Sequence, residues 1–398
     1  MIASVPVDRT FDVAVVGAGP AGAATALLLA RQGLRVALLD RARLPRPKPC
    51  AEYVNPGAVR MLTRLGLIDA VRAEHPTAIK GMRVVSPDGT VTEGRFETPG
   101  LALPRERLDA QVAAAAVRAG AALCDGTLVE QLTWEPNRVV LDARTGNTHV
   151  RIACRLLVGA DGLNSRVAHR LGVTRRPRRH RVALVGHAGG VDGMTDVGEM
   201  HVAAGTYVGL ADIGGGVTTV ALVADVDGAA PAAPPPSWLA RLIGRFPAVR
   251  ARLDGAEWIP PVRAVGPFGR STRRAVGDRV LLVGDATEFF DPFTGEGVHS
   301  ALRGAELAAA TIRAAFAAGS FTRRALAPYE WARRRAFTSK WIVERGIGAV
   351  VGRPRLLDHV AHRMARRPEL ADALVGVTGG LVSPAHVLDP RFLWQLVR

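Results

Sequence analysis

The sequence has few cysteines and no apolar run long enough to cross a membrane. Cys50, Cys124 and Cys154 are odd in number and widely spaced, and they form no CxxC pair, so neither a disulfide framework nor a zinc site is predicted. The apolar segment Ala21–Ala30 is too short to span a bilayer, and no basic segment precedes an apolar one at the N-terminus. We therefore expect a protein of the reducing cytoplasm, without a transmembrane segment or a secretion signal.

Lysine is almost absent, and the strong positive charge comes from arginine. The formal net charge is +16, yet Lys48, Lys80 and Lys340 are the only lysines. Outside Arg175–Arg181 and Arg333–Arg335 the arginines are scattered, and no basic face carries the interleaved aromatic residues on which bases stack. Nucleic-acid binding is therefore not predicted. A solvated basic surface fits the charge best, with an anionic substrate or an acidic partner as alternatives.

The N-terminal part of the chain has the pattern of a β-α-β unit. Phe11–Val16 is a Val-rich run typical of a buried parallel strand, Ala21–Arg31 is typical of a helix, and Leu34–Asp40 is typical of a second strand. The pattern predicts further helices at Gly57–Leu65 and Arg107–Ala119, a hairpin of Ile79–Ser86 and Thr90–Phe96, and strands at Val129–Trp134, Val139–Asp142, His149–Ile152 and Leu156–Gly159.

A second region contains short strands separated by glycine-rich turns. These strands are expected at Val182–Gly186, Met200–Val202, Tyr207–Ala211 and Val217–Val223. Ala229–Pro236 is predicted to be a loop or tether, Trp238–Phe246 a helix, Val280–Val283 a strand of the first region, and the chain beyond Gly297 mostly helical.

The order of these elements predicts an α/β fold with a discontinuous first domain. We expect a Rossmann-like nucleotide-binding domain of residues 1–78, 100–180 and 272–325. An inserted, mostly antiparallel β-sheet domain of residues 79–99 and 181–271 is expected to bind substrate. Residues 326–398 are expected to form a C-terminal helical region.

The first β-α turn carries a dinucleotide-binding pattern. Gly17-Ala18-Gly19-Pro20-Ala21-Gly22 is GxGxxG between a predicted strand and a predicted helix. The first glycine permits the turn, the second lets a pyrophosphate approach the backbone, and the third lets the helix pack on the strand. Asp40 ends the second strand, where an acid binds ribose hydroxyls. This context favours a nucleotide site over a glycine-rich turn without a ligand.

Two further motifs lie at the ends of later strands. Leu157-Val158-Gly159-Ala160-Asp161-Gly162 is a strand followed by a turn. The stretch from Gly284 to Leu302, GDATEFFDPFTGEGVHSAL, places Asp285 at a strand end and bare backbone, Gly295 to Val298, at a helix start. In this order and spacing, the three motifs resemble those of the FAD-dependent oxidoreductases of the para-hydroxybenzoate hydroxylase fold.

The amino-acid sequences of two segments resemble those of one branch of that family. Lys48-Pro49-Cys50 and Asp291–Gly297 are similar to the geranylgeranyl reductase-like branch, which also contains tailoring hydroxylases of bacterial secondary metabolism, including antibiotic biosynthesis. The resemblance implies an FAD-binding domain of the glutathione reductase type. It also implies FAD as the cofactor, with NAD(P)H as a reductant that binds transiently or a partner reductase in its place.

The resemblance also implies the residues that hold FAD. Asp285 accepts hydrogen bonds from the ribityl chain, and the amides of Gly295–Val298 hold negative charge on the flavin ring. Arg105, or Arg107 as the alternative, lies near the ribityl and phosphate groups, and Val129 packs on adenine. The full expected set is Gly17, Gly19, Pro20, Ala21, Gly22, Asp40, Arg41, Cys50, Ala51, Arg105, Val129, Asp161, Gly162, Gly284, Asp285, Pro292, Gly295, Gly297 and Val298.

Three reactions are compatible with this resemblance. Monooxygenation of an aromatic or polyketide-like small molecule with O₂ is favoured. Double-bond reduction, as in geranylgeranyl reductases, is the main alternative, although Tyr207–Asp212 lacks the aromatic-Pro signature of prenyl reductases. Halogenation rests on Lys80, which stands where the halogenases carry a lysine, but the paired-Trp signature of halogenases is missing.

The catalytic residues are not determined by the sequence. Cys50, His201 and Tyr207 are weak candidates, and His187 is a further polar residue expected on the inner face of the inserted sheet. A non-enzymatic flavin-binding interaction protein is the remaining alternative. Its docking surface would be the basic amphipathic segment Trp331–Val351, which could also meet a carrier protein.

Overall fold

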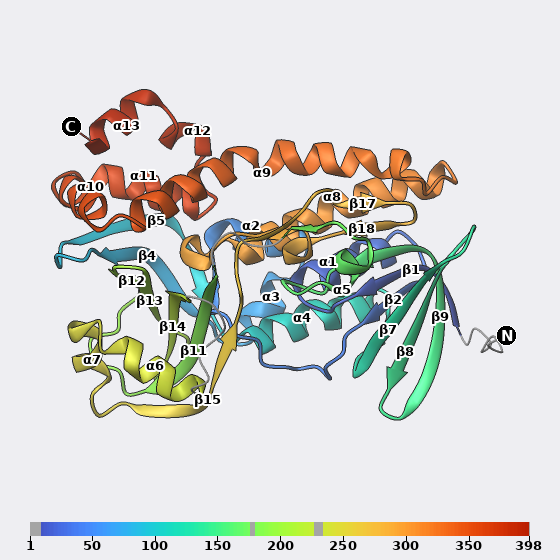
Figure 1. The fold of residues 1–398 in the computed structure, drawn as a ribbon, viewed down its shortest axis with the longest axis horizontal. Helices are drawn as coiled ribbons and strands as arrows, with labels where there is room; N and C mark the ends of the chain where they lie inside the picture. The colour runs from blue at the N-terminus through green and yellow to red at the C-terminus, as the bar shows by residue number, and fades with distance from the viewer. Residues whose placement is uncertain (1–8, 176–179, 227–233, 398) are drawn as a thin grey trace.

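The computed structural model describes residues 9–175, 180–226 and 234–397. Two large sheets lie side by side, and the long helix α9 (Arg323–Val351) runs above the helices of the first sheet toward the second (Figure 1). Parts of the expected basic run at 175–181 and of the expected tether at 229–236 lie outside the described residues. Among the described residues, none of the helices has both the length and the apolar character needed to cross a membrane.

The first sheet joins strands from three distant parts of the chain. Its order is β17–β18–β9–β1–β2–β6, with parallel pairing from β18 to β6, and β8 and β7 extend it from β9 as an antiparallel hairpin (Figure 1). The strands are β1 (Arg9–Val16), β2 (Val36–Leu39), β6 (Ala122–Cys124), β7 (Thr127–Trp134), β8 (Val139–Thr145), β9 (Thr148–Gly159), β17 (Val276–Gly277) and β18 (Val280–Leu282).

Both faces of this sheet are covered. Val13 and Val15 on β1 pack into a core shared with α1 (Pro20–Ala30), α4 (Arg105–Arg118) and α8 (Gly297–Ala317), whereas Ala14 packs into a second core with β8 and α5 (Arg166–Arg170). A parallel strand buried on both faces is apolar at every position rather than at alternate positions. The apolar run Phe11–Val16 therefore predicts the strand correctly.

The strands β6 and β15 (Glu257–Val265) are not among the predicted ones, and β9 differs from its prediction. His149–Ile152 and Leu156–Gly159 are expected as two strands, but they belong to the single twelve-residue strand β9. The segment between them, Ala153–Arg155, contains neither Gly nor Pro. The first half of β9 therefore pairs antiparallel with β8, and the chain continues without a turn to pair in parallel with β1.

The second sheet is mostly antiparallel, as expected. Its order is β15–β11–β14–β13–β12–β4–β5–β3, and only β12 and β4 pair in parallel. The edge position of β15 suits its two prolines, Pro260 and Pro261, because proline cannot donate to a ladder. The strands are β3 (Tyr53–Val54), β4 (Thr77–Val85), β5 (Val91–Ala102), β11 (Arg181–Gly189), β12 (Val197–Ala203), β13 (Thr206–Asp212), β14 (Val217–Asp225) and β15 (Glu257–Val265).

Helices and short elements complete the fold. α6 (Pro235–Ile243) and α7 (Pro247–Leu253) cover one face of the second sheet, and α11 (Pro368–Thr378) packs against β5. The strands β10 (Thr174–Arg175), β16 (Arg270–Thr272) and β19 (Glu288–Phe289) form a separate small sheet. The remaining elements are α2 (Pro56–Arg64), α3 (Ile68–Arg72), η1 (Gly284–Ala286), η2 (Pro292–Thr294), α10 (Pro354–Arg366), α12 (Pro384–Val387) and α13 (Pro390–Val397).

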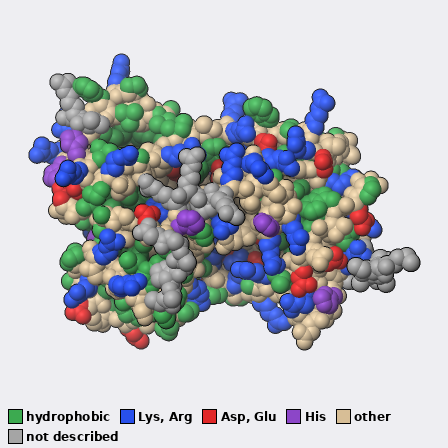
Figure 2. Space-filling model, viewed as in Figure 1, with side chains coloured by type: hydrophobic (Ala, Val, Ile, Leu, Met, Phe, Trp, Pro, Cys, Tyr) green, Lys and Arg blue, Asp and Glu red, His purple; other side chains and the backbone are tan. Residues whose placement is uncertain are grey.

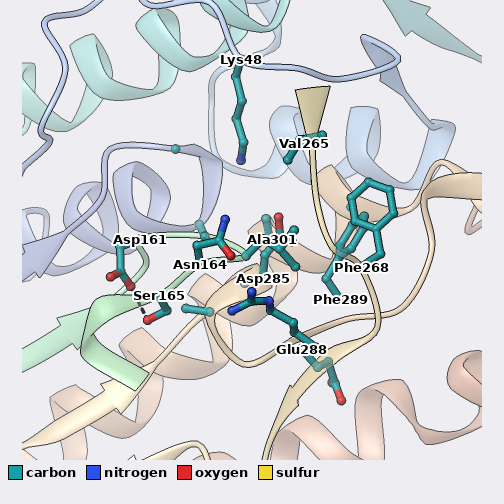
Figure 3. A pocket seen from close by; sticks show the side chains of 18 of the residues that line it. Lys48, Asp161, Asn164, Ser165, Val265, Phe268, Asp285, Glu288, Phe289 and Ala301 are labelled. Carbon is teal, nitrogen blue, oxygen red and sulfur yellow. Dashed lines mark hydrogen bonds between the residues drawn. The ribbon is translucent and has the colours of Figure 1, made fainter. Parts of the chain in front are cut away.

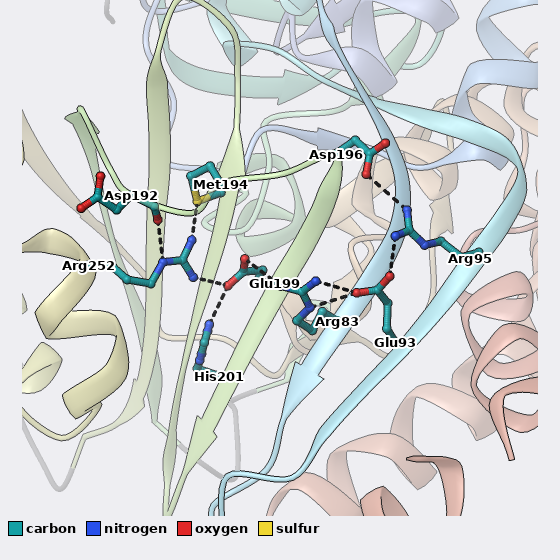
Figure 4. A network of polar contacts seen from close by, with 9 residues as sticks. All are labelled: Arg83, Glu93, Arg95, Asp192, Met194, Asp196, Glu199, His201 and Arg252. Carbon is teal, nitrogen blue, oxygen red and sulfur yellow. Dashed lines mark hydrogen bonds and ion pairs between the residues drawn. The ribbon is translucent and has the colours of Figure 1, made fainter. Parts of the chain in front are cut away.

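A buried carboxylate on the second sheet is held by side chains from three elements (Figure 4). Glu199 on β12 is 1% exposed and accepts hydrogen bonds from Arg252 on α7 at 2.6 Å and from His201 at 2.8 Å, with Arg83 of β4 3.6 Å away. Burial alone would raise the pKa of Glu199, but hydrogen bonds from His201 and Arg252 and the Arg252 charge hold it below its usual value. This network fastens α7 to the sheet.

Removal of Arg252 tests the network. Arg252→Met leaves Glu199 buried with fewer partners, so the free energy of unfolding is expected to fall by about 2 kcal/mol. The exposed Arg250→Met on the same helix is the matched control and is expected to leave stability unchanged. Denaturant unfolding followed by circular dichroism measures both variants. Equal stability of the two variants would contradict the assignment.

Candidate active site

A large cavity lies between the two sheets. Its volume is about 1820 Å³, and its lining runs from the β1–α1 turn to the inner face of the second sheet. Drug-sized ligands occupy sites of roughly 300–1,000 Å³, so the cavity has room for an extended cofactor and a substrate together. On the face drawn in Figure 2, Lys and Arg side chains lie around a hollow near its centre, and Arg41, Arg46, Arg166 and Lys48 line the cavity.

Close packing shapes the nucleotide end. A Cβ at Gly17, where φ is +104°, would lie 2.3 Å from the Ala160 carbonyl oxygen, and one at Gly22 would lie 1.8 Å from the Gly17 oxygen. The backbone of β1, the start of α1 and the end of β9 therefore touch directly. At Gly19 the nearest atom to a Cβ is 3.9 Å away, which leaves the helix N-terminus open to a ligand.

Acidic and basic side chains alternate in a series of ion pairs next to this turn. The Asp40 carboxylate accepts hydrogen bonds from the Ala18 amide at 2.9 Å and from Arg46 at 3.0 Å. Arg46 also reaches Asp109 at 3.3 Å, and Asp109 accepts from Arg105 at 2.9 Å. Burial alone would raise the pKa of Asp40, but hydrogen bonds and charge from Arg46 hold it below its usual value.

This series of ion pairs ends beside Cys50, a member of the expected cofactor-binding set. Arg105 is 6% exposed, and its guanidinium lies 3.4 Å from the Cys50 sulfur. Arg105 is therefore a buried, paired residue rather than a solvated one, and Arg107, the alternative, pairs weakly with Glu74 at 4.0 Å and does not line the cavity. Sequence reasoning missed Arg46 and Asp109, because ion pairs between distant segments leave no local pattern.

The Asp161 carboxylate is hydrogen-bonded to the residues at the start of α5. It accepts hydrogen bonds from the Ser165 hydroxyl at 2.5 Å and from the amides of Arg166 at 2.6 Å and Val167 at 3.2 Å (Figure 3). Burial raises the pKa of Asp161, although these hydrogen bonds oppose the rise. Its carboxylate thus fixes the turn before α5, while the residue lines the cavity.

The Gly284–Leu302 stretch presents an open carboxylate and an open helix end to the cavity. Among the described residues, no hydrogen bond or ion pair engages the Asp285 side chain, which lines the cavity (Figure 3). The first amides of α8, from Gly297 and Val298, have no acceptor within the helix. Gly295 has φ +66°, and a Cβ there would lie 2.5 Å from the Tyr53 ring, so the loop presses closely on β3.

The far end of the cavity is mainly apolar. Its walls are side chains of alternate positions on the second sheet together with aromatic rings from other elements. They are Ala183, Val185, Met200, Ala221, Val223, Val265, Phe268, Phe289, Phe337 and Trp341. A polar group interrupts this wall: the Tyr207 hydroxyl donates to Asp291 at 2.5 Å, and Arg181 pairs with the other Asp291 oxygen. Burial raises the pKa of Tyr207 far above its usual value.

The structure brings most of the expected residues together. All members of the expected cofactor set except Gly22 line the cavity. Of the weak catalytic candidates, Tyr207 lines it too, as does Cys50, which belongs to both sets. His201 does not, because strand alternation turns its neighbour Met200 to the cavity and His201 to the Glu199 network. His187 pairs with Glu52 at 2.8 Å outside the lining, and Lys80 pairs with Asp196 at the surface. The hypothesis of a halogenase lysine at Lys80 therefore has no support from its position.

Comparison with known proteins identifies the family of the chain. The sequence model of the FAD binding domain family matches residues 10–224. The chain belongs to this family. It is 30% identical to digeranylgeranylglycerophospholipid reductase 1 of Methanothermobacter thermautotrophicus over 80% of this chain and 81% of that protein. It is also 30% identical to menaquinone reductase of Mycolicibacterium smegmatis over 75% of each.

A solved structure shows the same fold. CmlS, a flavin-dependent halogenase, superimposes with a TM-score of 0.78 at 22% identity, covering 98% of this chain and 78% of that one. The chain is thus an FAD-dependent oxidoreductase of the expected α/β fold, and its cofactor is FAD. The finer reaction is not fixed by these likenesses.

The residues present fit FAD. Open backbone at Gly19 and the α1 N-terminus suit a pyrophosphate. Asp40 Oδ1 accepts one hydrogen bond, from Ala42, and keeps room for a ribose hydroxyl. The open Asp285 carboxylate suits the ribityl hydroxyls, and the free α8 amides suit the pyrimidine end of the ring. We propose these contacts as the FAD-binding set.

Loss of the Asp285 carboxylate tests this set. Asp285→Ala removes an acceptor for the ribityl hydroxyls, and FAD affinity is expected to fall roughly tenfold, about 1.5 kcal/mol. The exposed Glu97→Ala is the control and is expected to bind FAD like the wild type. Titration of the apo-protein with FAD, followed by quenching of flavin fluorescence, measures both. Unchanged affinity in Asp285→Ala would show that Asp285 does not touch the cofactor.

Proposed function

We propose that this FAD-dependent oxidoreductase reduces a carbon–carbon double bond in a long, mostly apolar substrate such as a prenyl chain. The observation that carries the proposal is the apolar wall of the cavity beyond the α8 N-terminus, formed by Ala183, Val185, Ala221 and Val223. The similarity to a digeranylgeranylglycerophospholipid reductase and to a menaquinone reductase supports it.

The side chains suit such a substrate. An apolar chain gains about 0.8 kcal/mol for each methylene group taken from water, so the wall can hold a long substrate without specific hydrogen bonds. Reduced FAD supplies a hydride when it is bound, with NAD(P)H or a partner reductase as the proposed source of electrons. The cavity-lining residues of α9, Phe337 and Trp341, lie over the site and exclude water from the reacting bond.

Hydroxylation of an aromatic or polyketide-like molecule is the second candidate, with O₂ as the co-substrate. It is favoured by the Tyr207–Asp291–Arg181 group, which offers a phenol a polar partner inside the apolar wall. It is also favoured by the absence of the aromatic-Pro signature from Tyr207–Asp212. The two reactions differ in the fate of the substrate and in their need for oxygen.

The products separate the two candidates. We expect the FAD-loaded protein, reduced with dithionite under nitrogen, to add two hydrogen atoms to a geranylgeranyl lipid, as measured by mass spectrometry. The same protein in air with NADPH is expected to add no oxygen atom to phenolic lipids. Addition of one oxygen in air, without any anaerobic saturation, would instead establish the hydroxylase.

Narrowing the wall tests the place of the substrate. Ala221 is 8% exposed and lines the cavity, so Ala221→Phe is expected to block long substrates while FAD binding stays unchanged. We expect at least a tenfold lower kcat/KM for a geranylgeranyl lipid, since overpacking costs about 1–3 kcal/mol. Val117→Phe is the control, because Val117 is exposed on α4 and lies outside the cavity lining. Undiminished turnover in Ala221→Phe would move the substrate away from this wall.

A further inference from the structure

One face of α9 lines the cavity along its length. Tyr329, Arg333, Phe337, Trp341 and Glu344 all belong to the lining and are three or four residues apart. This spacing places side chains on one face of a helix. Four of the five have ordinary roles as aromatic wall or, for Arg333, as the ion-pair partner of Glu288 at 2.9 Å. Glu344 is the exception.

The part of α9 that carries Glu344 is fastened to the first turn of α8. The Lys340 ammonium, 7% exposed, lies 2.8 Å from a Glu296 carboxylate oxygen and 3.2 Å from both His299 Nδ1 and the Ser300 hydroxyl. Burial and nearby arginines lower the pKa of His299 to about 4, so its neutral ring can accept from Lys340. Glu344, four residues further, is therefore held beside the end of the cavity proposed to contain the flavin ring.

The Glu344 carboxyl group has no hydrogen bond or ion pair among the described residues. The other acidic groups at this end are engaged: Asp291 with Tyr207 and Arg181, and Glu288 with Arg333. The Lys340 charge acts on Glu344, but no hydrogen bond holds this cavity-lining carboxyl group, so it is free to meet a ligand. Sequence reasoning missed Glu344 because a single acid on a basic amphipathic helix resembles an ordinary surface residue.

Burial brings the pKa of Glu344 into the neutral range. Burial and the Asp291 carboxylate raise the pKa of Glu344 to about 7, while Lys340 and Arg345 on its own helix oppose the rise. Glu288, across the cavity, adds a further negative charge. Burial also lowers the pKa of Lys340. Asp291, which is ion-paired, and Glu344, which has a raised pKa, thus lie in one site. Such a pair of carboxyl groups is a common arrangement for acid catalysis.

We propose that Glu344 is the catalytic acid that protonates the substrate carbon during double-bond reduction. The inference rests on the proposed reductase function. The π bond breaks, one carbon takes the hydride that reduced FAD supplies, and the other forms a C–H bond with the Glu344 proton. The O–H bond of Glu344 breaks, and the carboxylate regains a proton from Lys340 or from solvent, so the atoms and electrons balance.

Glu344→Gln tests the proposal by two independent readouts. The first is infrared spectroscopy of the FAD-loaded protein across a pH titration, which needs no substrate. The wild type is expected to show the carbonyl band of a protonated carboxyl group that disappears as pH rises through about 7. The band is expected to be absent from Glu344→Gln and present in the exposed control Glu369→Gln.

The second readout is single-turnover saturation of a geranylgeranyl lipid by the dithionite-reduced protein. Glu344→Gln is expected to be about 100-fold slower, the usual effect of a missing general acid, while Glu369→Gln matches the wild type. Glu344→Asp is expected to restore part of the rate. In the wild type the rate is expected to fall as pH rises through about 7, because the donor is then ionised.

The outcomes separate the two proposals. A wild-type rate in Glu344→Gln overturns the assignment of the acid but leaves the reductase intact. An infrared titration that is identical in the wild type and Glu344→Gln also overturns it. A protonated Glu344 in a protein that saturates no double bond overturns the reductase function, and the role of the acid falls with it.

Discussion

The contact of Gly17, Gly22 and Ala160 is the constraint on which the rest of the site depends. A Cβ at either glycine would overlap backbone atoms, so the end of β1, the start of α1 and the end of β9 meet without side chains between them. This contact aims the N-terminus of α1 into the space beyond the carboxyl ends of the parallel strands, where open α/β sheets bind their ligands. The other cofactor contacts are arranged around that point: Asp40 follows β2, and Asp285 follows β18.

The second sheet and α9 extend the nucleotide site into a large cavity. Residues of β11 and β14 present small apolar side chains to the cavity, while their neighbours pack under α6 and α7. Helix α9 covers the other side and is fixed by Lys340 to α8 and by Arg333 to Glu288. The proposed ring site therefore has an apolar wall on one side and a titratable carboxyl group, Glu344, on the other. The proposed reaction requires this asymmetry, because it delivers a hydride to one carbon of the double bond and a proton to the other.

The sequence predicts those parts of the molecule that depend on local backbone needs. Gly17 and Gly295 lie where a Cβ would overlap neighbouring atoms, and the acids Asp40, Asp161 and Asp285 follow strand ends. All five residues line the cavity. Features that depend on strand parity or on distant pairs are harder to predict. His201 was expected on the inner face, but Met200 occupies it, since a one-residue difference reverses the side of a strand. The Arg46–Asp109 pair joins segments 63 residues apart, and nothing near either residue in the sequence indicates it.

The crystal structure of the FAD complex tests the account most directly, because the central claim is where the cofactor lies. The account predicts the pyrophosphate at the α1 N-terminus and the ring between the Cys50–Ala51 loop and the first turn of α8, facing the apolar wall and Glu344. A ring that lies outside this chamber, or density for FAD that leaves Asp285 and the α8 amides without contact, would contradict it.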